Sequence, residues 1–431
     1  MSPLKIKPFR DLWLGQAISQ AGDSFYFIIF AFMVQKVTGS AAMVGYTCAL
    51  ELLPFLVVAP YAGVIADRLD RRKIMLSSDL LCVLFLLIFA IIVIVAGQPP
   101  VWAMMGTALS MSLARVFFFP AKSAAVPALV PEEQLLSANA LSQATQNIMP
   151  LLSLPLSATV LLSLYKLSPS LFLLSAVGLN FLSFIGSAIF VAKLPQIKPE
   201  RTNDAHPVQE MKDGFQYIAK SHELKVMIIL QFLLNIMISP FFVVYLTANK
   251  DWFGDNPANL AWCEFSFFLG MVSTSFLVGR LKISRVGISY ICGVAGVGLA
   301  VAGMAFSRHI GLFLALNLFA GLSLPFAHIP VATYLQIAVP DSYRGRVNSA
   351  WSIVSIGVQP IGMALGGVLV QAIGLVGAFL TMGFGMAGAG ALGLVDQRFR
   401  RMLMPAGAAP IGVEDREFVS EASAAGVEVG A

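Results

Sequence analysis

Three ionisable residues lie near the middle of long apolar stretches of the sequence. Asp23 falls in the first such stretch, Glu51 in the second and Arg115 in the fourth. An isolated charge at the centre of a bilayer costs about 2.5–3.5 kcal/mol even on lenient insertion scales. We therefore predict that Arg115, the one cation at that depth, pairs with the two carboxylates.

A carboxylate in such surroundings can carry a proton, because nearby charge and water decide whether its ionised form is stable. We predict that Asp23 or Glu51 takes up and releases a proton as a cavity around Arg115 opens and closes. Glu51 is the better candidate, since one arginine cannot fully neutralise both acids. The alternative is a fixed ion pair that only holds the helices together.

A second pattern joins the second and third apolar stretches. Gly63, Asp67, Arg68, Arg71 and Arg72 have the spacing Gly-xxx-Asp-Arg-xx-Arg-Arg. Glycine permits close contact between helices, a carboxylate is favoured at a helix N-terminus, and arginine donates charge-assisted hydrogen bonds. We predict a gating loop here. An ordinary basic loop would explain the arginines but not the spacing.

Uncharged polar residues within the apolar stretches are candidates for contact with a substrate, although such residues more often bridge helices. A further acid, Glu264, lies near the outer end of the eighth stretch, where we expect it to be solvated. The substrate-cavity candidates are Gln20, Gln143, Gln146, Asn147, Gln231, Asn235, His328 and Gln359.

The composition identifies the class of protein that holds these residues. Hydrophobic residues make up 58% of the 431 and charged residues 12%, whereas soluble domains carry about 25% charged residues. A soluble enzyme, a disordered chain and a nucleic-acid-binding protein are excluded. The four cysteines have no metal-ligand or disulfide spacing, so we expect no metal site and no cofactor.

Counting apolar segments long enough to span a bilayer as a helix predicts an all-α polytopic membrane protein with twelve transmembrane helices. We divide it into an N-terminal six-helix bundle (1–193), a central loop (194–222), a C-terminal six-helix bundle (223–397) and a disordered tail (398–431). Within the loop, Val208 to Lys220 is predicted to form a short interfacial helix. The predicted spans are 11–36, 41–64, 74–97, 101–129, 137–164, 171–192, 224–249, 260–280, 286–306, 310–338, 348–372 and 375–396.

Lys and Arg gather on alternate loops, which predicts the orientation. Of the 28 basic residues, the loops of one side hold most, including the central loop, both termini and the Arg68 loop. Because basic loops stay in the cytoplasm, we expect both termini there, in a bacterial inner membrane. The opposite loops hold only Lys36, Lys166, Lys250 and Arg308.

The two halves show faint internal similarity. Pro131 precedes Asn139 by the same spacing that separates Pro340 from Asn348, at the loop between the fourth and fifth spans of each half. Duplicated six-helix halves with a binding site at their interface are typical of transporters. We therefore predict two pseudo-symmetric bundles.

The Gly63–Arg72 loop resembles the GxxxDRxxRR loop of the major facilitator superfamily. The stretches PFRDLWLGQAISQAGDSFY, FFFPAKSAAVPALVPEEQLLSANAL and PDSYRGRVNSAWS are similar to its drug-exporter branch of macrolide-efflux and enterobactin-exporter proteins. The resemblance implies that Asp67 engages the start of helix eleven and stabilises the outward-facing state, and that helices one, four, seven and ten line the cavity. Asn147 to Pro150 departs from the pattern, since it lacks the glycines usual in helix five of antiporters.

We interpret the chain as a secondary transporter that exports lipophilic or amphipathic molecules, such as drugs or siderophores, by proton exchange and alternating access. Its expected partners are the bilayer and a small molecule, with no nucleic acid and no obligate protein partner, as a monomer driven by the proton gradient. The alternative is a lysophospholipid transporter of the same fold. An intramembrane enzyme is remote, because the sequence contains neither HExxH nor GxSxG.

Overall fold

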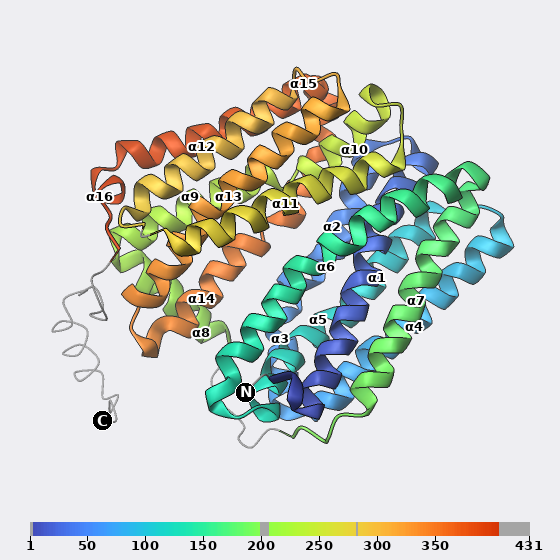
Figure 1. The fold of residues 1–431 in the computed structure, drawn as a ribbon, viewed down its shortest axis with the longest axis horizontal. Coiled ribbons are helices and arrows are strands. Elements are labelled where there is room, and N and C mark those ends of the chain that lie inside the picture. The colour runs from blue at the N-terminus through green and yellow to red at the C-terminus, as the bar shows by residue number, and fades with distance from the viewer. Residues whose placement is uncertain (1–2, 199–206, 282, 405–431) are drawn as a thin grey trace.

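The computed structural model describes residues 3–198, 207–281 and 283–404, and these ranges are almost wholly helical. Figure 1 shows two groups of helices side by side, the first in blue to green and the second in green to red. Most of the predicted C-terminal tail lies outside the described residues.

The first group, which we call the N-terminal bundle, packs mainly around α1. This helix contacts α6 and α7 along its length, while α4 packs against α5 and α7. A short 3-10 helix, Pro3–Lys5, precedes α1. The helices are α1 (Lys7–Thr38), α2 (Ala41–Val57), α3 (Ala59–Arg68), α4 (Arg71–Ala96), α5 (Val101–Leu129), α6 (Glu132–Leu167) and α7 (Pro169–Ala192).

The second group, the C-terminal bundle, packs around α12 and α13. Helix α12 contacts both α13 and α15, and α11 packs against α13. Its helices are α8 (Pro207–Lys220), α9 (His222–Ile238), α10 (Phe241–Trp252), α11 (Pro257–Arg280), α12 (Val286–Met304), α13 (Ile310–Ala338), α14 (Asp341–Ile356), α15 (Gln359–Val395) and α16 (Gln397–Arg400).

Several spans that the sequence predicted as single helices are broken. Helices α2 and α3 meet at a bend of 55°, next to Pro54 and Pro60, which cannot donate helical hydrogen bonds. Helices α9 and α10 meet at Pro240, and α14 and α15 meet before Pro360. Hydropathy does not reveal such breaks, because the composition stays apolar across them.

Nine helical segments of the described chain are long and apolar enough to cross a membrane, or ten if α2 and α3 count as one span. One of them, Arg346–Val395, has 50 residues and would be about 75 Å long at a rise of 1.5 Å per residue. It is interrupted at Gly374, whose φ of 71° is not helical, so it contains two spans. With α6 added, the arrangement is compatible with the predicted twelve helices in two six-helix bundles.

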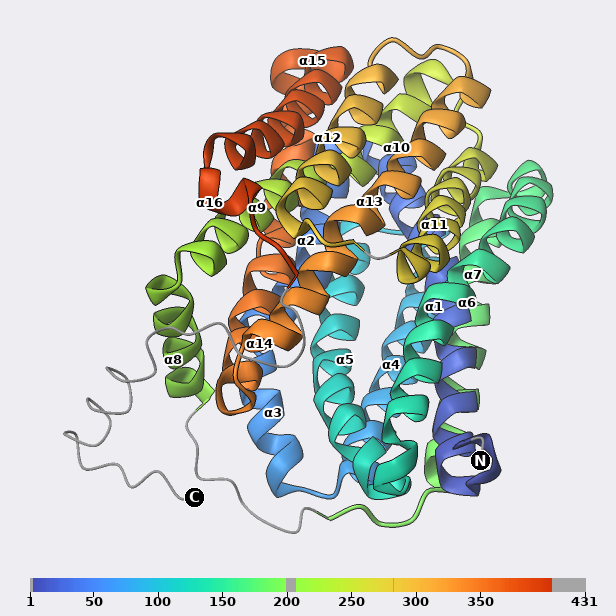
Figure 2. The same ribbon diagram turned by 60° about the vertical axis from the view of Figure 1, so that its left-hand side comes forward.

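The two ends of the molecule differ in how the bundles meet. We call the end with the start of α1 and the loops at 69–70 and 193–198 the basic side, lower in Figure 2, and the other end the opposite side. At the opposite side, Lys36 at the end of α1 forms an ion pair with Asp255 between α10 and α11. Deeper in, the rings of Phe27 and Phe242 lie 4.9 Å apart.

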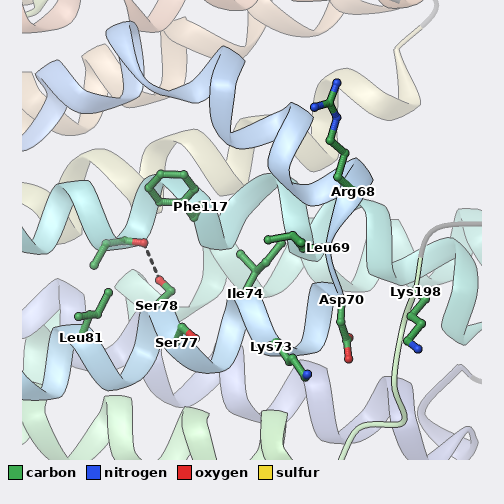
Figure 3. A pocket seen from close by; sticks show the side chains of 11 residues that line it. Arg68, Leu69, Asp70, Lys73, Ile74, Ser77, Ser78, Leu81, Phe117 and Lys198 are labelled. Atoms are coloured by element: carbon green, nitrogen blue, oxygen red, sulfur yellow. Dashed lines mark hydrogen bonds between the residues drawn. The ribbon is translucent and has the colours of Figure 1, made fainter. Parts of the chain in front are cut away.

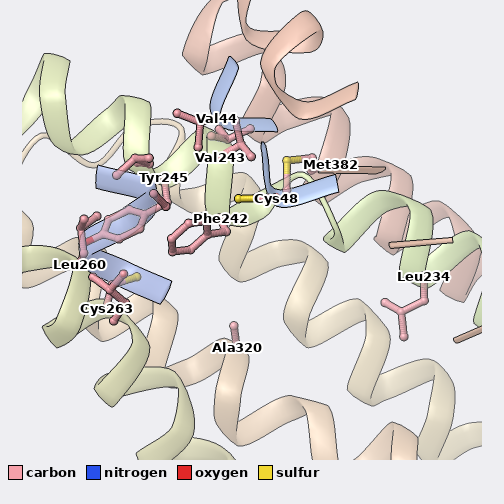
Figure 4. Close-up of a cluster of buried hydrophobic side chains, with 14 of the residues drawn as sticks. Val44, Cys48, Leu234, Phe242, Val243, Tyr245, Leu260, Cys263, Ala320 and Met382 are labelled. Atoms are coloured by element: carbon pink, nitrogen blue, oxygen red, sulfur yellow. The ribbon is translucent and has the colours of Figure 1, made fainter. Parts of the chain in front are cut away.

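Small residues allow α2 and α15 to pack closely at this side. A Cβ atom at Gly367 would overlap the backbone of Ala41 and Ala42, and one at Gly45 would overlap the backbone of Met363. Figure 4 shows Val44 and Cys48 of α2 among buried apolar side chains of the C-terminal bundle. These contacts seal the molecule at the opposite side.

The predicted helix in the central loop is present as α8, but its apolar face has a different partner. We expected this face to lie on the membrane surface. Instead α8 packs against α14, where the rings of Tyr217 and Tyr343 stack 4.9 Å apart and Asp213 forms a 3.5 Å ion pair with Arg346. The helix therefore belongs to the C-terminal bundle.

The end of α15 is fastened to α9 on the basic side. His222 Nε2 lies 2.6 Å from an Asp396 carboxylate oxygen. The backbone N–H of Phe399 and the adjacent His222 hold the pKa of Asp396 below its ordinary value. This contact joins the first and last spans of the C-terminal bundle.

We predict that Gly367→Val weakens the seal at the opposite side, because the added side chain cannot fit against Ala42. A bifunctional thiol reagent should crosslink Lys36→Cys to Asp255→Cys in a Cys292→Ser background, and Gly367→Val should reduce that yield several-fold. Gly388→Val is the matched control, since a Cβ atom at Gly388 meets nothing within 4 Å. Equal yields in the two valine variants would contradict the role assigned to this packing.

Candidate functional site

A cavity of about 510 Å³ lies between the two bundles. We call it the central cavity. Helices α1, α2 and α5 form one wall, and α11, α14 and α15 form the other. Its lining is Asp23, Ser24, Tyr26, Phe27, Ile28, Glu51, Leu52, Phe55, Arg115, Phe119, Glu264, Phe268, Ile356, Gln359 and Met363.

The three charged residues singled out in the sequence meet in this cavity. A guanidinium nitrogen of Arg115 lies 2.9 Å from an Asp23 carboxylate oxygen and another lies 3.9 Å from a Glu51 oxygen. Their side chains are 24%, 19% and 19% exposed, so the cluster is largely shielded from bulk water. The expected pairing of Arg115 with both acids is therefore present.

Neighbouring helices hold these side chains in place. The Asn180 side chain of α7, itself fully buried, donates a 3.4 Å hydrogen bond to Asp23. Ser112 of α5 donates to the backbone carbonyl of Glu51, which fixes α2 against α5 at the level of the cluster. Asn180 and Ser112 were not predicted from the sequence, because their importance depends on which helices are neighbours.

Our expectation for Glu264 was wrong. We placed this acid near the outer end of the eighth span and expected it to be solvated, but it lines the central cavity opposite the Arg115 cluster. In the part of the chain that the structure describes, Glu264 has no ion-pair partner. The cavity thus holds three carboxylates and one arginine, an excess of negative charge when all are ionised.

The cavity walls also differ from those that the family resemblance implied. Spans one and four contribute Asp23 and Arg115 as expected, but the C-terminal wall comes from α11, α14 and α15 rather than from α9 and α13. A smaller pocket of about 190 Å³ adjoins it inside the C-terminal bundle and shares Glu264, Gln359 and Met363 with it. The rest of its lining is apolar apart from Ser239 and Asn317.

The polar candidates from the sequence lie in different places. Gln359 lines the central cavity, and Gln20 lines a pocket within the N-terminal bundle. Gln231 donates a 3.4 Å hydrogen bond to Ser355 and so ties α9 to α14. Asn235 donates to the Gln231 carbonyl, a contact within α9.

The other four polar candidates do not line the central cavity or are not described. His328 is exposed on α13, and Gln146 is half-buried on α6. The side chains of Gln143 and Asn147 lie outside the described residues. Of the two that are described, neither His328 nor Gln146 lines the central cavity.

The residues of the proposed gating loop connect four helices at the basic side. Arg71 donates to the carbonyls of Ala66 and Ala124, at 3.3 and 3.0 Å, and lies 4.0 Å from Asp67. Arg72 donates to the carbonyl of Ala192 at the end of α7. The loop therefore joins α3, α4, α5 and α7.

Gly63 and Asp67 of this loop are not tightly packed in this conformation. Gly63 was expected to permit close helix contact, but a Cβ atom there would meet nothing within 4 Å, so in this conformation the glycine faces open space. Asp67 is 51% exposed and its ion-pair partner is Arg71. Its engagement with the start of α14 remains a prediction for another conformation.

A further pocket of about 620 Å³ opens beside this loop on the basic side. We call it the surface pocket. Figure 3 shows Arg68, Asp70, Lys73 and Lys198 toward one end, and Phe117, Ser78 and Leu81 toward the other. Because it lies apart from Glu51 and Glu264, we assign the candidate site to the central cavity.

Two buried ionisable residues near the cluster were missed or left unassigned in the sequence. Asp79 is 2% exposed and accepts a 2.7 Å hydrogen bond from Ser187, while Lys122 is 7% exposed. Both lie closer to the basic end of their helices than Arg115 does, and a residue near a predicted span end is easily taken for a solvated one. Within the described residues, no group of three His, Cys, Asp or Glu is placed to hold a metal ion.

Two pseudo-symmetric helical bundles around a charged central cavity define a secondary transporter of the major facilitator superfamily. More narrowly, a model of the family described as Transmembrane secretion effector matches residues 1–405, and the chain belongs to this family.

Known proteins agree with this assignment. Macrolide efflux protein A of Streptococcus pyogenes is 27% identical over 381 residues, which cover 87% of this chain and 92% of that protein. Enterobactin exporter EntS of Escherichia coli O1:K1 is 26% identical over 409 residues, covering 93% and 95%. A bacterial homologue of the iron transporter ferroportin, solved in an inward-facing state, shares the fold with a TM-score of 0.65, 16% identity, and coverage of 91% and 99%.

We predict that Arg115→Met lowers the free energy of unfolding by about 3–5 kcal/mol, because it leaves buried carboxylates without a partner. Adding Asp23→Asn to Arg115→Met should cost less than the sum of the two single changes. Thermal unfolding in detergent measures both effects. Arg308→Met, which removes a cation stacked on Trp252 at the surface, is the control. Additive losses in the double variant would contradict the coupling.

Proposed function

We propose that this protein exports lipophilic or amphipathic small molecules in exchange for protons, by alternating access to the central cavity. The observation that carries the proposal is the Arg115 cluster in the wall of that cavity. One cation facing two carboxylates can hold one acid ionised while the other gains or loses a proton. The same wall is mostly apolar, as a lipophilic substrate requires.

We propose that the basic side faces the cytoplasm and that both termini lie there, in a bacterial inner membrane. The distribution of Lys and Arg over alternate loops supports this orientation. With it, the seal formed by Lys36, Asp255 and the α2–α15 contact closes the periplasmic side. The conformation is then inward-facing and ready to receive a substrate from the cytoplasm.

The transport cycle follows from this arrangement. A proton reaching Glu51 or Asp23 from the periplasmic side weakens the hold of Arg115 on that carboxylate, and the bundles return to the inward-facing state. Substrate then enters the cavity as the proton leaves to the cytoplasm. Engagement of Asp67 with the start of α14 would stabilise the outward-facing state, from which the substrate is released.

The charge of the central cavity and the names of similar proteins limit the class of molecule that is exported. Three carboxylates against one arginine favour neutral or positively charged amphiphiles over anionic ones. Relatives named for macrolide efflux and enterobactin export support export of bulky small molecules by this family. The exporter acts as a monomer and needs no cofactor, because the proton gradient supplies the energy. It performs no covalent chemistry.

We predict that Glu51→Gln and Asp23→Asn change the pH dependence of transport, because each removes a carboxylate from the Arg115 cluster. Gradient-driven efflux should fall at least tenfold in Glu51→Gln, and its remaining rate should vary little with pH. The measurement is efflux by proteoliposomes over a range of pH. Asp251→Asn, an exposed acid at the end of α10, is the matched control. Unchanged pH profiles in both cluster variants would refute the coupling role.

Cargo is tested with a panel of a macrolide, a catecholate siderophore and a lysophospholipid in proteoliposomes with an imposed pH gradient. We expect the macrolide to be driven by the gradient and the siderophore to be transported poorly, because its negative charge meets Glu264. Gradient-independent flipping of the lysophospholipid alone would replace this proposal by the lipid-transport alternative.

A further inference from the structure

A second polar pocket lies within the N-terminal bundle, behind the Arg115 cluster. We call it the N-bundle pocket. Its volume is about 50 Å³, room for a few water molecules at roughly 10–15 Å³ each. Its lining from α1, α4, α5 and α7 is Gln16, Ser19, Gln20, Asp23, Ser78, Asp79, Arg115, Phe118, Phe119, Lys122 and Phe184.

This pocket shares walls with two other cavities. Asp23, Arg115 and Phe119 line both the N-bundle pocket and the central cavity. Ser78 lines both the N-bundle pocket and the surface pocket of Figure 3, which opens on the basic side. The N-bundle pocket therefore lies between the surface pocket and the central cavity, with Ser78 on one side of it and Asp23, Arg115 and Phe119 on the other.

The helix registers place the polar groups along this direction. Gln16 lies seven residues before Asp23 on α1, and Lys122 lies seven residues after Arg115 on α5. Seven residues correspond to about 10 Å along a helix, in both cases toward the basic side. Asp79, eight residues after Arg71 on α4, lies at a comparable depth.

Two of the described lining residues have polar atoms that no protein atom satisfies. Gln16 Nε2 and Gln20 Oε1 are buried without a hydrogen-bond partner, and Lys122 has no ion-pair partner among the described residues. Buried polar groups of this kind are normally satisfied by water. The lining is therefore suited to a short chain of hydrogen-bonded water.

The charges facing Asp79 are balanced. Asp23 faces it from α1, Arg115 and Lys122 from α5, and Cys82 lies on its own helix, while α7 contributes the uncharged Ser187. Two cations and two carboxylates give the pocket no net charge when all are ionised. A pocket so small and balanced does not favour a metal cation, but a proton can pass along its water and carboxylates.

We propose that the N-bundle pocket is a proton path, with Asp79 as its relay, that joins the Arg115 cluster to the basic side separately from the route of the substrate. The inference rests on the proposed proton-coupled export. A proton leaves the protonated carboxyl of the cluster to water in the pocket, and the water passes a proton to the Asp79 carboxylate. Asp79 then releases it to water beyond Ser78, so both acids end ionised and no other bond changes.

A separate path removes a conflict in the transport cycle. A lipophilic substrate that fills the central cavity displaces the water there, and with it the direct way out for the proton. A path behind Asp23 lets the proton leave while the substrate is bound. The substrate and the proton then do not compete for one shared opening.

The test compares two transport modes of Asp79→Asn in proteoliposomes. Counterflow exchanges labelled for unlabelled substrate without net proton movement, whereas gradient-driven efflux requires proton release. We expect Asp79→Asn to retain counterflow within twofold and to lose gradient-driven efflux at least tenfold, and Asp79→Glu to restore much of it. Asp11→Asn, the same change at a buried acid of α1 outside the pocket, should keep both activities.

Each other outcome overturns the relay. Retained gradient-driven efflux in Asp79→Asn would exclude it while leaving the proposed export intact. Loss of counterflow together with efflux in Asp79→Asn would assign the residue a purely structural role. A wild-type protein that is insensitive to the pH gradient would refute proton coupling itself, and the relay with it.

Discussion

The structure depends on one guanidinium held between two carboxylates in the wall of the central cavity. A buried arginine or acid alone is costly there, so Arg115, Asp23 and Glu51 are stable only while they remain together. This constraint fixes how α1, α2 and α5 sit relative to one another. It also makes the cluster sensitive to anything that changes its water or its charge, including substrate, protons and movement of the second bundle.

The two bundles contribute unequally to this arrangement. The N-terminal bundle holds the paired charges and, behind them, the pocket with Asp79 and Lys122, whereas the C-terminal bundle offers Glu264 and a largely apolar side pocket. In the function that we propose, the first bundle transfers protons and the second contacts the apolar substrate. The packing of α2 against α15 and of α6 against α11 joins them.

Much of the fold could be predicted from the sequence because bilayer thickness sets the length of each apolar segment. The spans over 101–129 and 310–338 match α5 and α13 at both ends. The pairing of Arg115 could also be predicted, since it followed from the cost of an isolated charge. The breaks at Pro54 and Pro240 could not be predicted, because hydropathy carries no information about the direction of the helix axis.

The parts of the site that were missed depend on which helix faces turn inward. Glu264 and Asp79 both lie within a few turns of a span end, where depth alone suggests contact with water. Contacts from other helices show that they are enclosed. Ser187 of α7 donates a hydrogen bond to Asp79, and Glu264 lines the central cavity between the bundles. A single sequence does not show which helix faces lie against one another.

The most direct test of the account is whether substrate binding expels a proton from the Arg115 cluster. Purified protein in weakly buffered detergent solution, with a pH-sensitive dye, reports proton release as substrate is added. We expect about one proton per substrate bound in the wild-type protein near the pH of half-maximal transport, and none in Glu51→Gln with Asp23→Asn. Saturable substrate binding with no proton release at any pH would contradict the central claim.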